Sequence, residues 1–367
     1  MRFVRPLSSH FAALLLIAVP PVAGASAGAG IDTARALAHA APDATLREEL
    51  LHDVAAFLAR RGDSAGARSA AAQQPPGRQA MVLLELAGHL PDLRSNEAEQ
   101  LALDAQTAKA LTTDWRKARV AHLLAVAYAR RGKFDAAIAL AHTVPDPEEK
   151  ASALQAVVAH LNRAGEVAKA RELAATIEEN RRYGTYRQKA AALADTAQTV
   201  HARGNPDDAA TLLALAELLL PKKPGWSDGG AYRDVAVATY RCGQKDQAFE
   251  LLTRAEALAQ QIAGPWKVTE LTRIAAAWRD CADVARAAAR LTEAAVFLKT
   301  LQPLERAEEA LALAQGWALA GESLDGKAQA RALVTAVLAA ADREGNPETW
   351  RKPRVRALLA LAELGGK

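Results

Sequence analysis

AVAYARRGKFDAAIAL, from Ala125 to Leu140, has the pattern of a helix end, a tight turn at Gly132 and the start of a second helix. Tyr128 lies four residues before the glycine, and Ala137 lies five residues after it. Glycine takes up the left-handed backbone conformation that ends a helix without steric cost. We expect the small alanine to let the two helices approach closely and the larger residue before the turn to fill the space between them. The stretch therefore predicts an antiparallel helical hairpin.

The same frame recurs along the whole chain, and its last four steps are each 39 residues long. Alanine stands five residues after every turn position except the last, where Gly326 stands. A single hairpin cannot bury its apolar face alone, so its neighbours must stack on it. The turn positions are Gly62, Leu93, Gly132, Gly165, Gly204, Gly243, Ala282 and Gly321. The residues four before them are Leu58, His89, Tyr128, Leu161, Val200, Thr239, Trp278 and Trp317.

The turn glycine followed by alanine, as in GKFDAAIAL from Gly132 and GEVAKARELA from Gly165, resembles the second-helix signature of the tetratricopeptide repeat (TPR) family. The resemblance covers residues 44 to 345. It implies an all-α fold, an open right-handed α-solenoid of about eight antiparallel helical hairpins that is closed by a C-terminal helix. It also implies a non-catalytic role, because such arrays commonly bind peptides or proteins on their concave face.

The sequence departs from the family in its repeat length, since the usual unit has about 34 residues. Aromatic residues also lie farther from the turn than usual, 16 to 18 residues before it. We interpret the extra residues as a longer first helix or a longer loop between hairpins. The aromatic residues are Trp115, Tyr186, Trp226 and Trp266.

The composition favours closely packed helices and argues against a surface that binds nucleic acids. Half of the 367 residues are hydrophobic but only 5% are aromatic, and alanine is the best helix former. Lys and Arg number 46 against 42 Asp and Glu, and two of the positive charges, Arg2 and Arg5, lie in a segment that we expect to be removed. A near balance of charges gives no basic surface of the kind that nucleic acids require.

The N-terminal 25 residues have the three parts of a secretory signal peptide. A positive start precedes the apolar run from Phe11 to Val19, which is too short to span a bilayer, because a transmembrane helix needs roughly 20 residues. Ala23-Gly24-Ala25 then provides a cleavage site, and cleavage after Ala27 or retention as an uncleaved anchor are the alternatives. We expect an exported protein, periplasmic or secreted, without stable membrane insertion.

Four segments follow from these patterns. Residues 1–25 are the signal peptide, residues 26–43 form a partly disordered lead-in, residues 44–345 form the TPR-like array, and residues 346–367 form a C-terminal capping helix.

Thr45 and Glu48 have the spacing of a capping box, which predicts a helix from there to Arg60. Proline-rich connections separate the hairpins, because proline cannot continue a helix interior. They include 75–77, 145–147 and 221–230.

The two cysteines, Cys242 and Cys281, are one 39-residue repeat apart and each directly precedes its turn. An oxidising compartment favours a disulfide between them. However, packed helices lie roughly 8–10 Å apart, and a disulfide needs Cα atoms within about 7 Å. The sequence therefore leaves two alternatives, a disulfide or two buried free thiols.

No pattern in the sequence indicates catalysis, a metal or a cofactor. The histidines are scattered without zinc-binding spacing, and no nucleophile elbow, phosphate-binding loop or dinucleotide fingerprint accompanies a strand. Paired carboxylates such as Glu148-Glu149 are typical of solvated helix faces. We therefore predict no cofactor and no enzymatic activity.

Basic and aromatic residues occur together in RRYGTYRQK, from Arg181 to Lys189, and in PKKPGW, from Pro221 to Trp226. Both stretches lead into first helices of adjacent repeats, so we expect them on one edge of the solenoid. They suit a groove for an acidic peptide, a carboxylate terminus or an anionic polymer, and solvated or packing side chains are the alternative. The candidate ligand-binding residues are Arg181, Arg182, Tyr183, Tyr186, Arg187, Lys189, Trp226, Arg233 and Lys267.

Three functions remain in competition at this stage. The first is a non-catalytic scaffold of the bacterial cell envelope that binds another protein or a peptide. The second is a polysaccharide lyase or glycosidase built on a closed helical toroid, which would need aromatic platforms and a carboxylate or Tyr/His pair in a central pocket. The third, the helical part of a lytic transglycosylase, ranks lowest because no lysozyme-like segment follows Gly321.

Overall fold

The computed structural model describes residues 27–90, 96–97, 100, 114–320, 325–344 and 348–364. In these ranges the chain is α-helical, with two short 3₁₀ helices and no strand. The helices are α1 (Ala27–His39), α2 (Ala44–Arg60), α3 (Ser64–Ala71), α4 (Pro76–Glu85), η1 (Leu86–Gly88), α6 (Asp114–Arg130), α7 (Phe134–Thr143), α8 (Pro147–Ala164), α9 (Val167–Thr176), α10 (Tyr186–Ala202), α11 (Pro206–Leu219), η3 (Trp226–Asp228), α12 (Gly229–Arg241), α13 (Lys245–Gln260), α14 (Trp266–Asp280), α15 (Val284–Leu298), α16 (Pro303–Ala320), α17 (Gly326–Arg343) and α18 (Arg351–Leu364).

Six of the eight predicted turn positions fall within the described residues, and all six have a positive φ. Five are glycines and the sixth is Ala282, with φ 57°. Leu93 and Gly321 lie outside the described residues. The values at the glycines are 79° at Gly62, 73° at Gly132, 86° at Gly165, 82° at Gly204 and 85° at Gly243.

A Schellman cap closes the first helix at each of these turns. The carbonyl four residues before the turn accepts a hydrogen bond from the N–H one residue after it, at 2.9–3.3 Å. The turn residue's own N–H binds the carbonyl three residues back, which completes the motif. The accepting carbonyls belong to Leu58, Tyr128, Leu161, Val200, Thr239 and Trp278, so the large residue of the sequence frame is a fixed position of the cap.

The alanine five residues after each turn is fully buried, as the close approach of two helices requires. Its N–H makes the first backbone hydrogen bond of the second helix, to the carbonyl of the residue that follows the turn. These alanines are Ala67, Ala137, Ala170, Ala209, Ala248 and Ala287. The predicted all-α fold of antiparallel helical hairpins is confirmed for the described residues.

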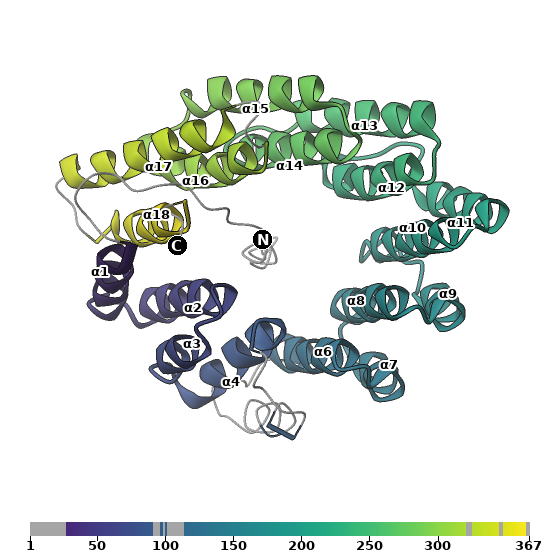
Figure 1. The fold of residues 1–367 in the computed structure, drawn as a ribbon, viewed down its shortest axis with the longest axis horizontal. Coiled ribbons are helices and arrows are strands. Elements are labelled where there is room, and N and C mark those ends of the chain that lie inside the picture. Colours follow the sequence, from purple (N-terminus) through teal and green to yellow (C-terminus); the bar gives the residue numbers. More distant parts are fainter. Residues whose placement is uncertain are drawn as a thin grey trace. The chain divides into compact units, whose positions relative to one another are not determined.

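The described chain divides into two compact units. Unit 2 runs from Ala55 to Leu301, and unit 1 combines the described residues up to Val54 with those from Gln302 onward. In unit 2 the first helices α4, α6, α8, α10, α12 and α14 pack side by side in an inner layer (Figure 1). The second helices α7, α9, α11, α13 and α15 form the outer layer, each packed on the first helix of its own hairpin.

Unit 1 joins segments from both ends of the sequence, because α1 and α18 pack against each other (Figure 1). Arg351 donates a hydrogen bond to the carbonyl of Leu37 at 3.1 Å. Arg356 binds the carboxylates of Asp53, at 2.7 Å, and Glu49, at 2.9 Å. The expected C-terminal helix therefore packs on the N-terminal segment as well as on the hairpin α16–α17.

Three details differ from the sequence predictions. The lead-in is ordered as α1, whose Ala34 and Ala38 are fully buried. Helix α2 begins at Ala44 instead of Thr45, because Asp43 is the residue whose side chain accepts a hydrogen bond, from the N–H of Leu46 at 2.7 Å. The predicted longer first helix is not found, and in most of the 39-residue repeats the second helix is longer instead, since α11, α13 and α15 have 14, 16 and 15 residues where α7 has 10. The predicted longer connection occurs twice, between α9 and α10 and, with η3 inside it, between α11 and α12.

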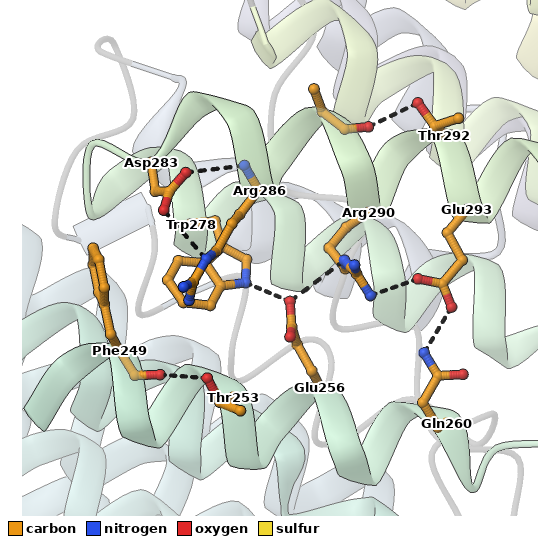
Figure 2. Close-up of polar contacts among 11 residues, drawn as sticks. Phe249, Thr253, Glu256, Gln260, Trp278, Asp283, Arg286, Arg290, Thr292 and Glu293 are labelled. Atoms are coloured by element: carbon orange, nitrogen blue, oxygen red, sulfur yellow. Dashed lines mark hydrogen bonds and ion pairs between the residues drawn. The ribbon is translucent and has the colours of Figure 1, made fainter. Parts of the chain in front are cut away.

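Trp278 shows how the frame's large residue joins neighbouring hairpins (Figure 2). It is fully buried on α14, and its indole N–H donates to Glu256 of α13 at 2.7 Å. The ring packs edge-on against Phe249 with centroids 5.0 Å apart, and the Arg286 guanidinium of α15 lies 4.4 Å from its centroid. Glu256 also pairs with Arg290 at 3.4 Å. One side chain thus holds three helices together.

Ala282→Gly is expected to stabilise the protein by about 1 kcal/mol, because an L-residue in the left-handed region costs roughly 1–2 kcal/mol. The matched control is Gly243→Ala, which places the same methyl group at φ 85° and should cost a similar amount. Urea unfolding midpoints of the two variants measure the effects. Equal midpoints for wild type and Ala282→Gly would contradict the assigned turn conformation.

Trp278→Ala is expected to destabilise unit 2 by roughly 3–5 kcal/mol, since it opens a large cavity and removes the indole hydrogen bond to Glu256. Trp278→Phe keeps most of the apolar contact and should cost less. Thermal unfolding of both variants gives the comparison. A loss below about 1 kcal/mol for Trp278→Ala would show that this position is not a packing centre.

Candidate functional site

The predicted basic and aromatic stretch from Arg181 begins in the loop that leads into α10. Asn180 organises this loop: its backbone N–H donates to the Thr185 hydroxyl at 3.0 Å, and its side-chain oxygen accepts from the N–H of Arg182 at 2.9 Å. Gly184 takes a left-handed conformation with φ 71°. The loop therefore places Arg181, Arg182 and Tyr183 on the surface in a defined arrangement.

Tyr186, the first residue of α10, links two consecutive repeats. Its ring is buried, and its hydroxyl donates to the carboxylate of Asp228 in η3, ahead of α12. The other oxygen of Asp228 accepts from the N–H of Gly225 at 2.8 Å. Burial and the bond to Asp228 raise the pKa of Tyr186 to about 12, so the phenol stays protonated and keeps its donor role. Tyr186 is therefore a structural contact rather than a ligand-binding side chain.

Arg187 ties the same two repeats together on the surface. Its guanidinium donates to the carbonyl of Ser227 at 3.0 Å and to that of Gly184 at 3.3 Å. It also lies 5.6 Å from the Tyr186 ring centroid, and Arg181 lies 5.4 Å from the same centroid. These contacts bring both predicted stretches onto one edge, as the sequence indicated.

Arg233 and Lys267 are directed toward partners inside the protein. Arg233 of α12 forms an ion pair with Glu270 of α14, and each of these two side chains is only 11% exposed. Arg273 contacts the second oxygen of Glu270 at 3.4 Å. The Lys267 ammonium lies 5.3 Å from the Phe297 ring centroid, and Lys189 is half-buried on α10. Arg233 in particular joins α12 to α14.

Three aromatic rings remain exposed at the starts of three consecutive first helices. Tyr183 is 44% exposed, Trp226 is 52% exposed and Trp266 is 54% exposed. Because α10, α12 and α14 pack side by side with the same chain direction, their N-terminal ends lie on one side of unit 2. We call Tyr183, Trp226 and Trp266 the aromatic edge.

Positive charge accompanies the aromatic edge. Arg182 lies 5.7 Å from the Tyr183 centroid, and Lys222 and Lys223 are exposed in the loop before Trp226. In the described part of the chain no carboxylate forms an ion pair with these three cations. Two exposed acidic residues, Glu178 and Glu179, also lie in the loop ahead of α10. The edge can therefore stack against flat groups and bind anionic ones, the combination that Arg and aromatic side chains provide.

Trp266 was not among the predicted site residues. The polar contacts between successive first helices were not predicted either. Arg119 of α6 pairs with Glu85 of α4 at 3.4 Å and with Glu149 of α8 at 3.6 Å. His122 lies 2.6 Å from the same Glu149. These contacts could have been predicted from side chains of opposite charge that lie about one repeat apart in the sequence.

Both cysteines are free thiols, buried at the C-terminal ends of α12 and α14. Burial raises the pKa of the Cys242 thiol, and burial with the nearby Asp280 raises that of Cys281 to about 12. The protonated form is a poor nucleophile. Of the two alternatives, the structure has the free thiols and not the disulfide.

No group of three or more His, Cys, Asp or Glu side chains in the described ranges could hold a metal ion. No helix in the same ranges combines the length and the apolar character that crossing a bilayer needs.

No protein-family model matches the sequence, and no curated protein matches it significantly. Similar solved structures include TPR-like repeats of a kinesin light chain from Podosopora anserina, with 21% identity over 64% of this chain and 100% of that chain and a TM-score of 0.33. A Rap protein complexed with competence and sporulation factor has 13% identity, covers 86% of this chain and 97% of that chain, and has a TM-score of 0.33. The APC/C hetero-tetramer Cut9–Hcn1 has 13% identity, 87% and 70% coverage and a TM-score of 0.28. Similarity at this level adds nothing on function, so the proposals below rest on this chain's own residues.

Proposed function

We propose that this protein is a non-catalytic binding scaffold of the bacterial cell envelope that holds an acidic, extended segment of a protein partner along the aromatic edge. The observation that carries the proposal is an exposed aromatic ring close to the start of the first helix in three consecutive repeats. Every other aromatic side chain whose burial the structure describes is less exposed than these three.

The chemistry of the edge supports a peptide ligand. Exposed Trp and Tyr rings offer large contact areas with little conformational freedom to lose, which is why such residues dominate binding energy at interfaces. Arg182 and the two lysines before Trp226 favour an acidic partner and speed its association. A ligand that contacts all three rings must span three hairpins, so it has to be extended.

The rigid support behind the edge is the second argument. The Tyr186–Asp228 hydrogen bond and the Arg187–Ser227 contact fix the loop of Trp226 to the start of α10. The Arg233–Glu270 ion pair fixes α12 to α14, which carries Trp266. Because these side chains hold the surface in place before binding, little ordering is left for the ligand to impose.

The envelope location is supported by the sequence of residues 1–25, which lies outside the described residues. Its positive start, apolar run and small-residue cleavage site are typical of exported proteins. Nothing in the described residues favours the lyase or glycosidase alternative, since the aromatic rings lie at helix starts without an accompanying catalytic pair.

Site-specific photo-crosslinking tests the proposal. A photoreactive phenylalanine analogue at position 183, 226 or 266 is expected to give a cross-linked protein partner in cells that export the chain. The matched controls are positions 218 and 296, whose residues, Leu218 and Val296, are 75% and 60% exposed on second helices. Changing Arg182 and Lys223 together to Gln should weaken the cross-link about tenfold, which corresponds to roughly 1.4 kcal/mol.

Two results would count against this assignment. Equal cross-linking from the control positions would show that the partner does not bind specifically at the aromatic edge. Cross-linking that depends neither on Arg182 and Lys223 nor on added salt would show that the ligand is not acidic, because salt screens the attraction between exposed charges.

A further inference from the structure

A second group of charged side chains lies at the other end of the first helices, where they enter the left-handed turns. The position two residues before the turn carries arginine in several repeats. Because α6 and α8 pack side by side, Arg130 and Arg163 occupy neighbouring places in consecutive repeats. Both residues are exposed, and neighbouring groups partly cover the guanidinium of Arg130.

At the same position in two later repeats, the side chains of consecutive first helices come into contact and carry opposite charges. Arg241 of α12 reaches Asp280 of α14, the equivalent residue one repeat later, at 4.0 Å. Arg241 also donates to Gln198 of α10 at 2.9 Å. There the row holds one cation and one anion, whereas in α6 and α8 it holds two cations.

Two further basic groups join this like-charged pair. His160, one turn earlier on α8, lies with its Nδ1 3.1 Å from the Arg163 guanidinium. Arg203, at the end of α10, lies against the turn at Gly165, where an added Cβ would collide with its guanidinium. We call Arg130, His160, Arg163 and Arg203 the basic cluster.

The electrostatics of the basic cluster follow from this crowding. Burial, Arg163 and Arg130 together lower the pKa of His160 to about 4. Burial and the positive charges of Arg163 and Arg131 lower the pKa of Arg130. His160 is therefore neutral at pH 7, and because its Nδ1 accepts from Arg163, its proton lies on Nε2, where it can donate.

The carboxylates near the basic cluster do not neutralise it. Asp195 of α10 accepts a hydrogen bond from Asn162 at 2.7 Å, and Glu166 follows the turn at Gly165. In the described ranges no carboxylate forms an ion pair with Arg130, Arg163 or Arg203. Like charges held together repel, and an anion placed among them relieves that repulsion.

We propose that the basic cluster is a binding site for a phosphate-class oxyanion, either free phosphate or the phosphate group of a small monoester. Arg130 of α6, Arg163 of α8 and Arg203, which follows α10, carry planar guanidinium groups, the donors that bind phosphate in a bidentate manner. The Nε2–H of His160 supplies a neutral donor. This site is separate from the aromatic edge, since it lies at the opposite ends of the first helices.

The test is a titration of the mature protein with sodium phosphate at constant ionic strength, adjusted with sodium chloride. Wild type is expected to show a saturable rise in Tm, because a ligand that binds only the folded state stabilises it. Arg130→Gln combined with Arg163→Gln should weaken the apparent affinity about tenfold or more. The matched control is Arg241→Gln, at the same place in a repeat whose charge is already paired, and it should respond as wild type does.

Two further measurements keep the result unambiguous. In phosphate-free, low-salt buffer the double variant should have a Tm equal to or above that of wild type, since it removes like-charge repulsion, and its circular dichroism should be unchanged. Isothermal titration with phosphate and with glycerol 3-phosphate distinguishes a free anion from an esterified one by which binds more tightly. The proposal is overturned if wild type shows no saturable response or if the double variant responds as strongly as wild type.

Discussion

At every described turn of the repeat frame one backbone hydrogen bond reaches across a left-handed residue, from the N–H after the turn to the carbonyl four residues before it. This bond forms only when the intervening residue has a positive φ, which glycine adopts freely and Ala282 adopts at a cost. It fixes the direction in which the second helix leaves, and so it brings a fully buried alanine against the first helix. Stacking of first helix on first helix then follows from the uniform hairpins.

Stacking places side chains from similar heights on consecutive first helices next to one another, and we call such a group a row. What the row holds decides its role. Where opposite charges or a donor and an acceptor meet, as in Arg233 with Glu270 or Tyr186 with Asp228, the row holds the repeats together. Where the row leaves aromatic rings exposed or sets cations beside cations, it presents chemistry to a ligand. The aromatic edge and the basic cluster are rows of this second kind, at opposite ends of the same helices.

The hairpin frame could be predicted from the sequence because its cause is local: glycine, alanine and a large residue at fixed offsets determine the turn. The placement of the two basic and aromatic stretches on one edge followed from the repeat length alone. The exposure of the individual side chains could not be predicted in this way, because buried Tyr186 donates to Asp228, a residue 42 positions away that no local pattern marks. The pairing of α1 with α18 joins the two ends of the sequence, and their short amphipathic patterns do not specify a partner.

Residue-resolved amide hydrogen exchange of the folded protein tests the central claim, that a cross-turn hydrogen bond at each left-handed residue organises the repeats. The N–H groups of Asn205, Gln244 and Asp283 follow their turns and donate across them, so they are predicted to exchange as slowly as helix-interior amides. Those of Lys245 and Asp246, in the first turn of α13 where no side chain caps the helix, should exchange fast. Fast exchange at Asn205, Gln244 and Asp283 would contradict the account.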